Sequence, residues 1–222
     1  MSEELWTAVE NYVDGLLIPS DPVLDAAVAA SEAAGLPDIA VTASQGKLLY
    51  LLARMQRARR ILELGTLGGY STIWLARALP EDGSVVTIEA DKRHCEIARG
   101  NLARADLTSL VEFREGNALD VLPELAAEGL EPFDMVFIDA DKENTEPYFR
   151  WALRLSRVGA VIVVDNVIRE GKVADAATDD TRAQAMRRFF EVLASEPRVT
   201  ATTVQTVGSK GYDGFTIALI VA

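Results

Sequence analysis

Sulfur and imidazole ligands are scarce in this chain, which has one cysteine, Cys95, and one histidine, His94. A single cysteine excludes an internal disulfide framework and any zinc site that needs several thiolates. Long apolar runs are also missing, because the longest one, Phe215 to Ala222, is far too short to span a membrane. The first residues, Met-Ser-Glu-Glu-Leu-Trp, lack the basic and apolar segments of a secretory signal. These absences predict a cytoplasmic protein without a membrane segment.

Basic residues are in the minority: 22 Lys and Arg stand against 34 Asp and Glu, which gives a net charge of −12. This balance argues against nucleic acid or an anionic membrane as a partner. The chain has 222 residues, of which 49% are hydrophobic, enough for a substantial core and too many for a disordered chain. We therefore expect a single domain over residues 1–222.

Residues 1–58 have the apolar spacing of helices and few runs typical of strands. We expect this segment to be a helical extension that acts as a lid over a ligand site and contacts a second subunit. Its last helix is predicted over Thr42 to Arg57. The predicted buried side of that helix consists of Leu48, Leu49, Leu51, Leu52 and Met55.

Residues 59–222 have the pattern of a Rossmann-like core, in which short apolar runs alternate with helical segments. The predicted strands are residues 61–64, 85–88, 110–113, 135–138 and 160–164, and the predicted helices between and after them are residues 71–79, 91–105, 118–128 and 144–156. Such alternation predicts right-handed βαβ crossovers, which give a mostly parallel sheet with helices on both faces.

The end of the chain has a different pattern. After a predicted helix at 178–195, two β-rich runs at 198–206 and 214–221 flank a turn-rich loop at 207–213 that contains Gly208 and Gly211. Two strands joined in this way predict an antiparallel pair at the edge of the sheet. The predicted fold class is therefore α/β, with a seven-stranded, mostly parallel sheet and additional N-terminal helices.

A glycine-rich segment follows the first predicted strand, where open parallel sheets bind ligands. It runs from Glu63 through Gly65 and Gly69 to Ser71, and its glycines suit a tight turn as well as close approach of a ligand. The segment lacks the second glycine of the G-x-G-x-x-G dinucleotide motif and carries a carboxylate beside the ligand. Glu89 ends the second predicted strand, where an acidic residue can bind two ribose hydroxyls. These features favour a cationic nucleoside such as S-adenosylmethionine over NAD.

Small and polar residues, Gly116, Asn117 and Ala118, follow the third predicted strand. A small side chain at Ala118 leaves room for an adenine ring, and Asn117 is also suited to cap the next helix. Both interpretations can hold together.

Oxygen-bearing side chains follow the fourth and fifth predicted strands. Asp139 begins the segment Asp-Ala-Asp-Lys that ends at Lys142, and Asp165 is followed directly by Asn166. Two carboxylates and an amide oxygen suit Mg²⁺, Mn²⁺ or Ca²⁺ and are poor ligands for Zn²⁺. Each aspartate alone is equally compatible with a helix cap or an ion pair, but the pair at neighbouring strand ends favours a metal site.

With these motifs together, the sequence resembles the catechol / caffeoyl-CoA type O-methyltransferases, a cation-dependent and S-adenosylmethionine-dependent family. The resemblance covers about Val41 to Val173 and returns at Gly211 to Phe215. It implies a class I methyltransferase fold and, as is typical of family members of this length, a homodimer.

The resemblance also implies a role for each matching residue. The residues implied to surround the methionine part of the cofactor are Glu63, Gly65, Gly69 and Ser71. Glu89 is implied to bind the ribose, Ala118 to lie near the adenine, and Val41 to close over the cofactor. The implied metal ligands are Asp139, Asp165 and Asn166; Asp139 is also assigned to the cofactor site and to catalysis, together with Lys142 as general base. Thr145 and the segment Val158-Gly159-Ala160 depart from the family pattern without affecting these positions.

The expected reaction is methyl transfer from S-adenosylmethionine to a hydroxyl of a catechol-like small molecule. Two adjacent hydroxyls can chelate one divalent cation, most suitably Mg²⁺, and the cation then stabilises the phenolate. Caffeoyl-CoA is less favoured because it would bring several negative charges to an acidic protein. Three alternatives stay open: an NAD(P)-dependent oxidoreductase, a non-catalytic member of the fold, and methylation of a carboxylate or amine. His94 and Cys95 are expected to have only structural or surface roles.

Overall fold

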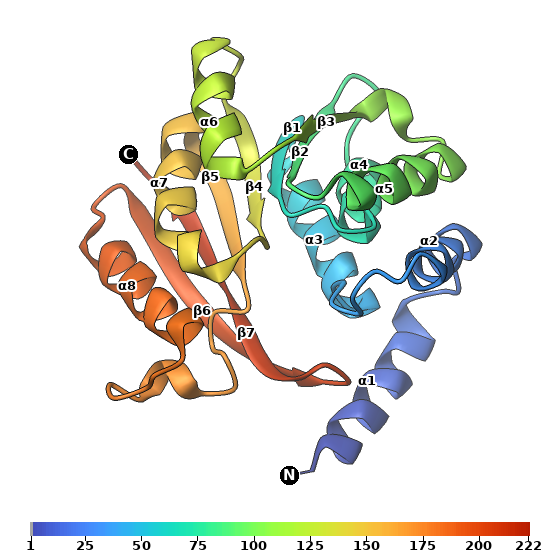
Figure 1. Ribbon diagram of the computed structural model, residues 1–222, viewed down its shortest axis with the longest axis horizontal. Helices are drawn as coiled ribbons and strands as arrows, with labels where there is room; N and C mark the ends of the chain where they lie inside the picture. Colours follow the sequence, from blue (N-terminus) through green and yellow to red (C-terminus); the bar gives the residue numbers. More distant parts are fainter. Residues whose placement is uncertain (1) are drawn as a thin grey trace. The chain divides into compact units, whose positions relative to one another are not determined.

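The computed structural model describes residues 2–222, which divide into two compact units. One unit is Tyr12–Glu131, and the other combines Met1–Asn11 with Pro132–Ala222. The strands of both units belong to one seven-stranded mixed sheet (Figure 1), which confirms the predicted α/β fold class. The division into an extension over 1–58 and a core over 59–222 stays a prediction.

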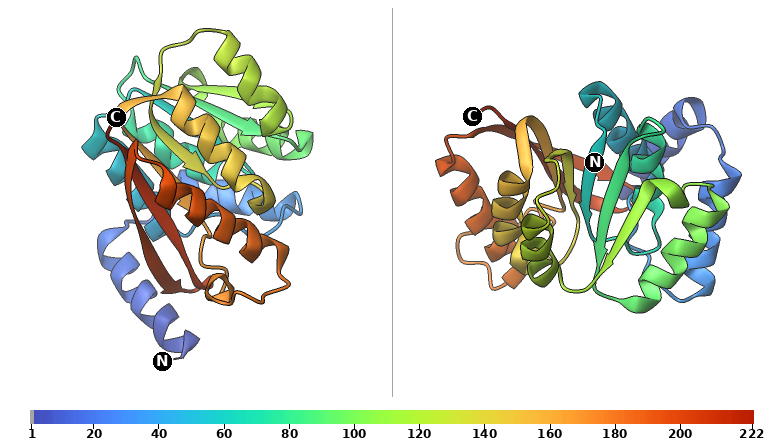
Figure 2. Two further views of the ribbon diagram at one scale, coloured as in Figure 1. Left: turned by 90° about the vertical axis from the view of Figure 1, so that its left-hand side faces the viewer. Right: turned by 90° about the horizontal axis from the view of Figure 1, so that it is seen from above.

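The unit Tyr12–Glu131 contains three parallel strands in the order β3-β2-β1. These are β1 (Arg60–Leu64), β2 (Ser84–Glu89) and β3 (Val111–Glu115), with a short 3₁₀ turn η1 (Thr108–Leu110) before the last. The helices α4 (Tyr70–Ala78) and α5 (Lys92–Arg104) lie on one side of these strands and α6 (Ala118–Ala127) lies on the other (Figures 1 and 2). Most residues of β1 and β2 are buried, as parallel strands covered on both faces require.

Three helices make up the N-terminal region, namely α1 (Glu3–Leu17), α2 (Pro22–Ala33) and α3 (Ala43–Gln56). The carboxylate of Asp21 caps α2 by accepting hydrogen bonds from the backbone N–H groups of Val23 (3.0 Å) and Leu24 (3.2 Å). Pro22 occupies the first turn, where its missing N–H costs nothing.

The predicted buried side of α3 is partly wrong. Leu49 is buried, but Leu51 and Met55 are 45% and 78% exposed. The helix packs against α4 through Gly46, where an added Cβ would lie only 2.3 Å from the Trp74 ring. The buried side of α3 therefore consists of Gly46, Leu49 and Ala53, and two of the predicted core residues lie on its exposed side.

The second unit contains two parallel strands, β4 (Phe133–Ile138) and β5 (Ser156–Asp165), followed by the antiparallel strands β7 (Gly211–Ile220) and β6 (Val199–Gly208). The helices α7 (Thr145–Leu155) and α8 (Thr181–Ser195) pack together beside these strands (Figures 1 and 2). Phe149 and Phe189 make an edge-to-face contact between the two helices, with ring centroids 5.4 Å apart. Two 3₁₀ turns complete the unit, η2 (Lys142–Asn144) and η3 (Lys172–Ala174).

The antiparallel C-terminal pair is confirmed, but the predicted loop at 207–213 is wrong. Gly208 pairs with Gly211, so only Ser209 and Lys210 form the turn. Gly211 has a φ of 87°, a left-handed conformation that glycine adopts without a steric penalty. The carboxylate of Glu10 in α1 accepts a hydrogen bond from the Ser209 backbone N–H and holds the turn.

No helix among residues 2–222 combines the length and the apolar character that a membrane span requires. The expected cytoplasmic location stays a prediction.

Asp21 provides a test of how α2 is held, because its carboxylate also pairs with Arg77 of α4. Asp21→Ala is expected to lower the free energy of unfolding by about 1–2 kcal/mol, since it removes a helix cap and a partly exposed ion pair. Asp21→Asn keeps a capping oxygen and loses only the charge, so it should cost less. Urea unfolding of the three proteins at pH 7 measures both effects.

The same pair predicts a pH dependence. The hydrogen bond from Arg77 is the main cause that lowers the pKa of Asp21 below its ordinary value of 3.8. The stabilisation from the charge is therefore fully present above pH 3.8 and is lost as the pH falls through the lower pKa of the folded state. A difference between wild type and Asp21→Asn that stays constant from pH 7 down to pH 2 would contradict this account.

Candidate active site

A buried carboxylate lies at the end of β1. Glu63 is fully buried, and its oxygens accept hydrogen bonds from the hydroxyls of Ser71 (2.7 Å), Thr72 and Thr87 (2.7 Å). Thr87 is the register partner of Glu63 on β2, and its hydroxyl is also 2.6 Å from that of Thr66. Several hydroxyls thus stabilise one negative charge beneath the glycine-rich segment, as a buried carboxylate needs.

The glycine-rich segment leaves β1 and starts α4 within a few residues. Gly69, with a φ of 81°, is the N-cap of α4 and approaches α5 so closely that an added Cβ would lie 3.2 Å from that of Ala98. Leu67 also has a positive φ of 48°, which is uncommon for a residue with a branched side chain. The backbone of this segment is therefore held in a conformation that needs fixed partners.

Glu89 supplies those partners from the end of β2. Its Oε2 accepts hydrogen bonds from the backbone N–H groups of Thr66 (3.1 Å) and Leu67 (2.9 Å). Its Oε1 accepts one from Asp91 (3.0 Å) and lies 3.5 Å from Nδ1 of His94. His94 was expected to have no part in a site, yet it contacts the residue predicted to bind the ribose.

Two further predicted cofactor residues of this unit, Ala118 and Val41, lie at or just before helix starts. Asn117 caps α6 by accepting a hydrogen bond from the Leu119 backbone N–H (2.8 Å), and Ala118 is the first residue of that helix and is buried. Val41 is also buried and directly precedes Thr42, the N-cap of α3. The structure brings Glu63 and Ser71 into direct contact, whereas Asp139 lies in the other unit.

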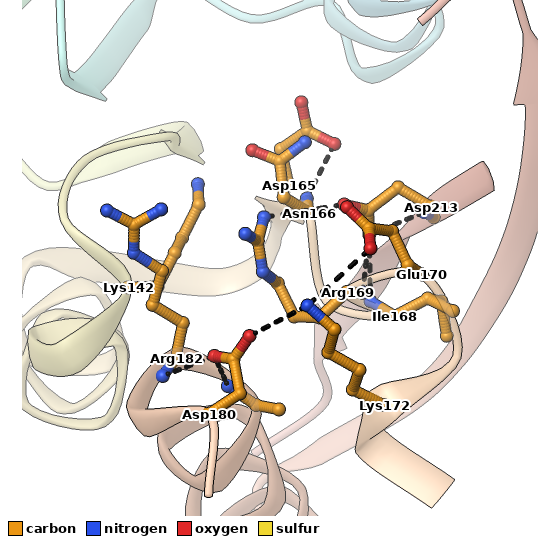
Figure 3. A network of polar contacts seen from close by, with 12 residues as sticks. Lys142, Asp165, Asn166, Ile168, Arg169, Glu170, Lys172, Asp180, Arg182 and Asp213 are labelled. Carbon is orange, nitrogen blue, oxygen red and sulfur yellow. Dashed lines mark hydrogen bonds and ion pairs between the residues drawn. The ribbon is translucent and has the colours of Figure 1, made fainter. Parts of the chain in front are cut away.

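The predicted metal ligands follow two hydrogen-bonded strands. Ile138 of β4 pairs with Val164 of β5, so the next residues, Asp139 just after β4 and Asp165 as the last residue of β5, lie at the same edge of the sheet. Asp165 is buried, and its Oδ1 accepts a hydrogen bond from the Asn166 backbone N–H (2.8 Å). Figure 3 shows the side chains of Asp165, Asn166 and Lys142 extending toward the same side of this edge.

Lys142 is held close to the first of these aspartates. Its Nζ lies 2.7 Å from Oδ1 of Asp139, and the lysine side chain is only 11% exposed. Asp141, between them, accepts hydrogen bonds from Asn144 (2.6 Å) and from the hydroxyl of Tyr148, which fix the turn. Burial is the main cause that raises the pKa of the Tyr148 phenol, so this hydroxyl stays a donor.

Within residues 2–222, no group of three or more His, Cys, Asp or Glu side chains is gathered as a metal site. The predicted set has two carboxylates and an amide, so it does not depend on such a group. The ligand roles of Asp139, Asp165 and Asn166 stay a prediction.

Sequence reasoning missed the hydroxyls around Glu63. A signal for them existed, because Glu63 and Thr87 are polar residues within otherwise apolar strands, at positions that pair in a parallel register. Cys95, by contrast, is buried on α5, and burial raises the pKa of its thiol to about 11. A thiol of this kind is not a reactive nucleophile.

Comparison with solved structures identifies the class of protein as an α/β methyltransferase. The O-methyltransferase from Bacillus cereus in complex with SAH is 56% identical, has a TM-score of 0.97, and is covered over 100% of its chain by 99% of this one. The O-methyltransferase TomG from Streptomyces achromogenes, involved in tomaymycin synthesis and solved with SAM, is 55% identical, with a TM-score of 0.96 and full coverage of both chains.

The sequence itself then gives the family. A family model described as O-methyltransferase matches residues 20–219, so the chain belongs to that family. A catechol O-methyltransferase of Niastella koreensis is 50% identical over 99% of this chain and 100% of its own, and one of Mycobacterium tuberculosis is 55% identical over 96% and 94%. The chain is an O-methyltransferase, which confirms the resemblance found in its motifs.

Replacing Thr87 tests whether the hydroxyls stabilise Glu63. Thr87→Val keeps the shape of the side chain but leaves a buried carboxylate with one donor fewer, so it is expected to lower the free energy of unfolding by about 1–3 kcal/mol. Thr87→Ser keeps the hydroxyl and should cost about 1 kcal/mol or less. Chemical denaturation measures both, and a Thr87→Val protein as stable as Thr87→Ser would show that the hydrogen bond contributes nothing.

Proposed function

We propose that the protein transfers the methyl group of S-adenosylmethionine to a hydroxyl of a catechol-like small molecule, assisted by a divalent cation. The observation that carries this proposal is the arrangement at the ends of β4 and β5. There Asp139 and Asp165 lie at the same edge of the sheet, Asn166 follows Asp165, and Lys142 is hydrogen-bonded to Asp139.

S-adenosylmethionine as the methyl donor is supported by residues of the unit Tyr12–Glu131 and by relatives. Glu63 and Glu89 place two carboxylates beside the glycine-rich segment, and a sulfonium cofactor carries a complementary positive charge. Related structures were solved with SAH and with SAM. We assign the methionine part to Glu63, Gly65, Gly69 and Ser71. We assign the ribose to Glu89, the adenine to Ala118, and closure over the cofactor and its reactive methyl to Val41. We also keep Asp139 among the cofactor residues.

The donor set at the ends of β4 and β5 fits a hard divalent cation. All three proposed ligands, Asp139, Asp165 and Asn166, offer oxygen, and Asp165 is buried. A cation held there would supply Lewis-acid stabilisation of the phenolate form of the acceptor. Oxygen ligands favour Mg²⁺, with Mn²⁺ and Ca²⁺ as alternatives.

Lys142 is assigned as the general base. A free phenol has a pKa of about 10 and is mostly protonated at neutral pH. After Lys142 has released its own proton, Nζ takes the acceptor's hydroxyl proton, the oxygen bonds to the sulfonium methyl, and the carbon–sulfur bond breaks to release S-adenosylhomocysteine. The hydrogen bond to Asp139 fixes the direction of Nζ, and the low exposure of Lys142 limits competition from water.

The acceptor class is supported by the names of relatives and by charge. Two relatives at 50% and 55% identity are named catechol O-methyltransferase. Two adjacent hydroxyl oxygens also suit a hard cation better than one does. The net charge of −12 disfavours acceptors that carry several negative charges, such as a CoA ester, and it disfavours nucleic acid.

A homodimer is the proposed assembly. The helix α1 has no buried residue, and large apolar side chains are exposed along its length: Leu5, Val9, Tyr12, Val13, Leu16 and Leu17. Exposed apolar surface of this extent marks an interaction site. A second copy of the same helix region would cover it, in line with the N-terminal extension expected to contact another subunit.

Methyl transfer to a catechol probe, with and without EDTA, tests the proposed function. The wild-type enzyme should lose most of its activity with EDTA and recover it with Mg²⁺. Asp165→Ala is expected to lower kcat/KM at least about 100-fold, because removing a cation ligand removes stabilisation of the phenolate. Its affinity for S-adenosylhomocysteine, measured by calorimetry, should stay within about twofold of the wild-type value.

The matched control is Asp175→Asn, which changes an exposed carboxylate of the same unit and should leave the kinetics unchanged. Full activity in EDTA would contradict the cation-assisted reaction, and activity with carboxylates or amines alone would contradict the acceptor class. Binding of NADH without binding of S-adenosylhomocysteine would contradict the methyl donor.

Light scattering coupled to gel filtration tests the dimer. Leu16→Glu places a charge within the exposed apolar side of α1, where Leu16 is 67% exposed, and is expected to give a monomer. Leu130→Glu changes an apolar residue that is exposed in a loop and should remain dimeric. A wild-type protein that is monomeric at micromolar concentration would refute the proposed assembly.

A further inference from the structure

The C-terminal strand β7 carries a motif that the reaction described above does not use, Gly-Tyr-Asp-Gly-Phe from Gly211 to Phe215. Its aspartate makes an unusual set of contacts. Oδ1 of Asp213 accepts hydrogen bonds from three backbone N–H groups, those of Ile168 (2.9 Å), Arg169 (3.0 Å) and Gly214 (2.9 Å). Two of these groups belong to the segment that directly follows Asn166.

That segment has a strained backbone. Asn166, Arg169 and Glu170 have φ values of 55°, 54° and 57°, in the left-handed region; asparagine adopts it more readily than other residues with side chains, whereas arginine and glutamate seldom do. Such conformations persist only where surrounding contacts fix them, and they concentrate at functional sites. The backbone φ of Asn166 sets the direction in which its side chain leaves the chain. A change in φ would therefore move the amide oxygen away from Asp165.

Gly214 holds the same segment from the other side. Its carbonyl oxygen accepts a hydrogen bond from the Val167 backbone N–H (3.0 Å). An added Cβ at Gly214 would lie 2.4 Å from the Val204 carbonyl oxygen and 2.7 Å from Cγ1 of Ile168, so only glycine fits there. Asp213 and Gly214 together therefore bind three consecutive residues, 167–169, to β7.

The side chain of Arg169 completes the contact. Its Nη1 lies 3.6 Å from Oδ2 of Asp213, so the carboxylate binds both the backbone and the guanidinium of one residue (Figure 3). The two side chains are 21% and 23% exposed, which reduces screening by solvent. Figure 3 also shows Lys172 bound to Asp180 and Glu170, which leaves Asp213 as the acidic partner of Arg169 in this network.

We propose that Asp213 is a positioning residue that fixes the backbone of residues 166–169 and thereby directs the oxygen of Asn166 toward the cation site. The proposal rests on the proposed function for the role of Asn166 as a ligand. The Gly-Tyr-Asp-Gly-Phe motif thus acts at the end of β5, although more than forty residues of sequence separate the motif from that strand end.

Hydrogen exchange on the protein without added cation tests the first half of the proposal. In Asp213→Ala the backbone amides of residues 167–169 should exchange at least about 10-fold faster than in the wild type, because their acceptor is gone. Asp213→Asn keeps a carbonyl oxygen at the same position and should show a smaller increase. The control is Glu196→Ala, which removes another carboxylate that binds a backbone N–H and an arginine, those of Arg198.

Binding of Mn²⁺, followed by electron paramagnetic resonance, tests the second half. Asp213→Ala should weaken Mn²⁺ binding about 10–100-fold, the loss typical when a partner that orients a ligand is removed. Asp213→Asn should recover part of the affinity, and Glu196→Ala should bind Mn²⁺ as the wild type does. The affinity for S-adenosylhomocysteine should be unchanged in all three proteins, which a general loss of folding would not allow.

The outcomes separate this proposal from the proposed function. Unchanged exchange at 167–169 in Asp213→Ala overturns the positioning role directly. Faster exchange with unchanged Mn²⁺ affinity also overturns it, because the segment would then not orient a ligand. If the wild type binds no Mn²⁺, the cation site of the proposed function fails, and with it the task assigned to Asp213. Should Asp213→Ala not fold, Asp213→Asn carries the same comparison.

Discussion

In each of the two units, a carboxylate that accepts backbone N–H groups fixes a loop that follows a parallel strand. Glu89 accepts two from the segment after β1, and Asp213 accepts two from the segment after β5. In each loop a residue that bears a side chain has a positive φ, Leu67 in the first and Asn166 in the second. A loop held in this way has lost its conformational freedom before any ligand arrives, so less entropy is lost when the ligand binds.

The same contacts limit how many further hydrogen bonds the Glu89 carboxylate can accept. A carboxylate has about four lone-pair positions, and Glu89 uses two for the loop and one for the Asp91 backbone N–H. The one remaining position, on Oε1, is the one open to a ribose hydroxyl. A bidentate interaction with two hydroxyls would therefore share oxygens that already hold the loop, which couples the fold of the glycine-rich segment to binding of the nucleoside.

Much of the fold could be predicted from the sequence, because periodicity reports which side of an element is buried. Alternating apolar runs and helical segments sufficed for the parallel strands, and the polar residues after each run, such as Glu89, Asp139 and Asp165, lie at the strand ends as expected. Periodicity failed for α3, where apolar residues occur on more than one side. There the buried side includes Gly46, which lets α3 approach Trp74 closely and which an apolar pattern does not indicate.

The parts of the site that could not be predicted depend on contacts between residues distant in sequence. Glu63 was expected beside the cofactor, but the polar residue Thr87 within an apolar run was the only signal for its hydroxyl partners, and Thr72 gave none. Asp213 was noticed only as part of a motif, because its partners at 168 and 169 come from another strand end. Residue types at strand ends predict which chemistry is available. Tertiary packing decides which side chains hold those residues in place. A single sequence contains no direct signal for that packing.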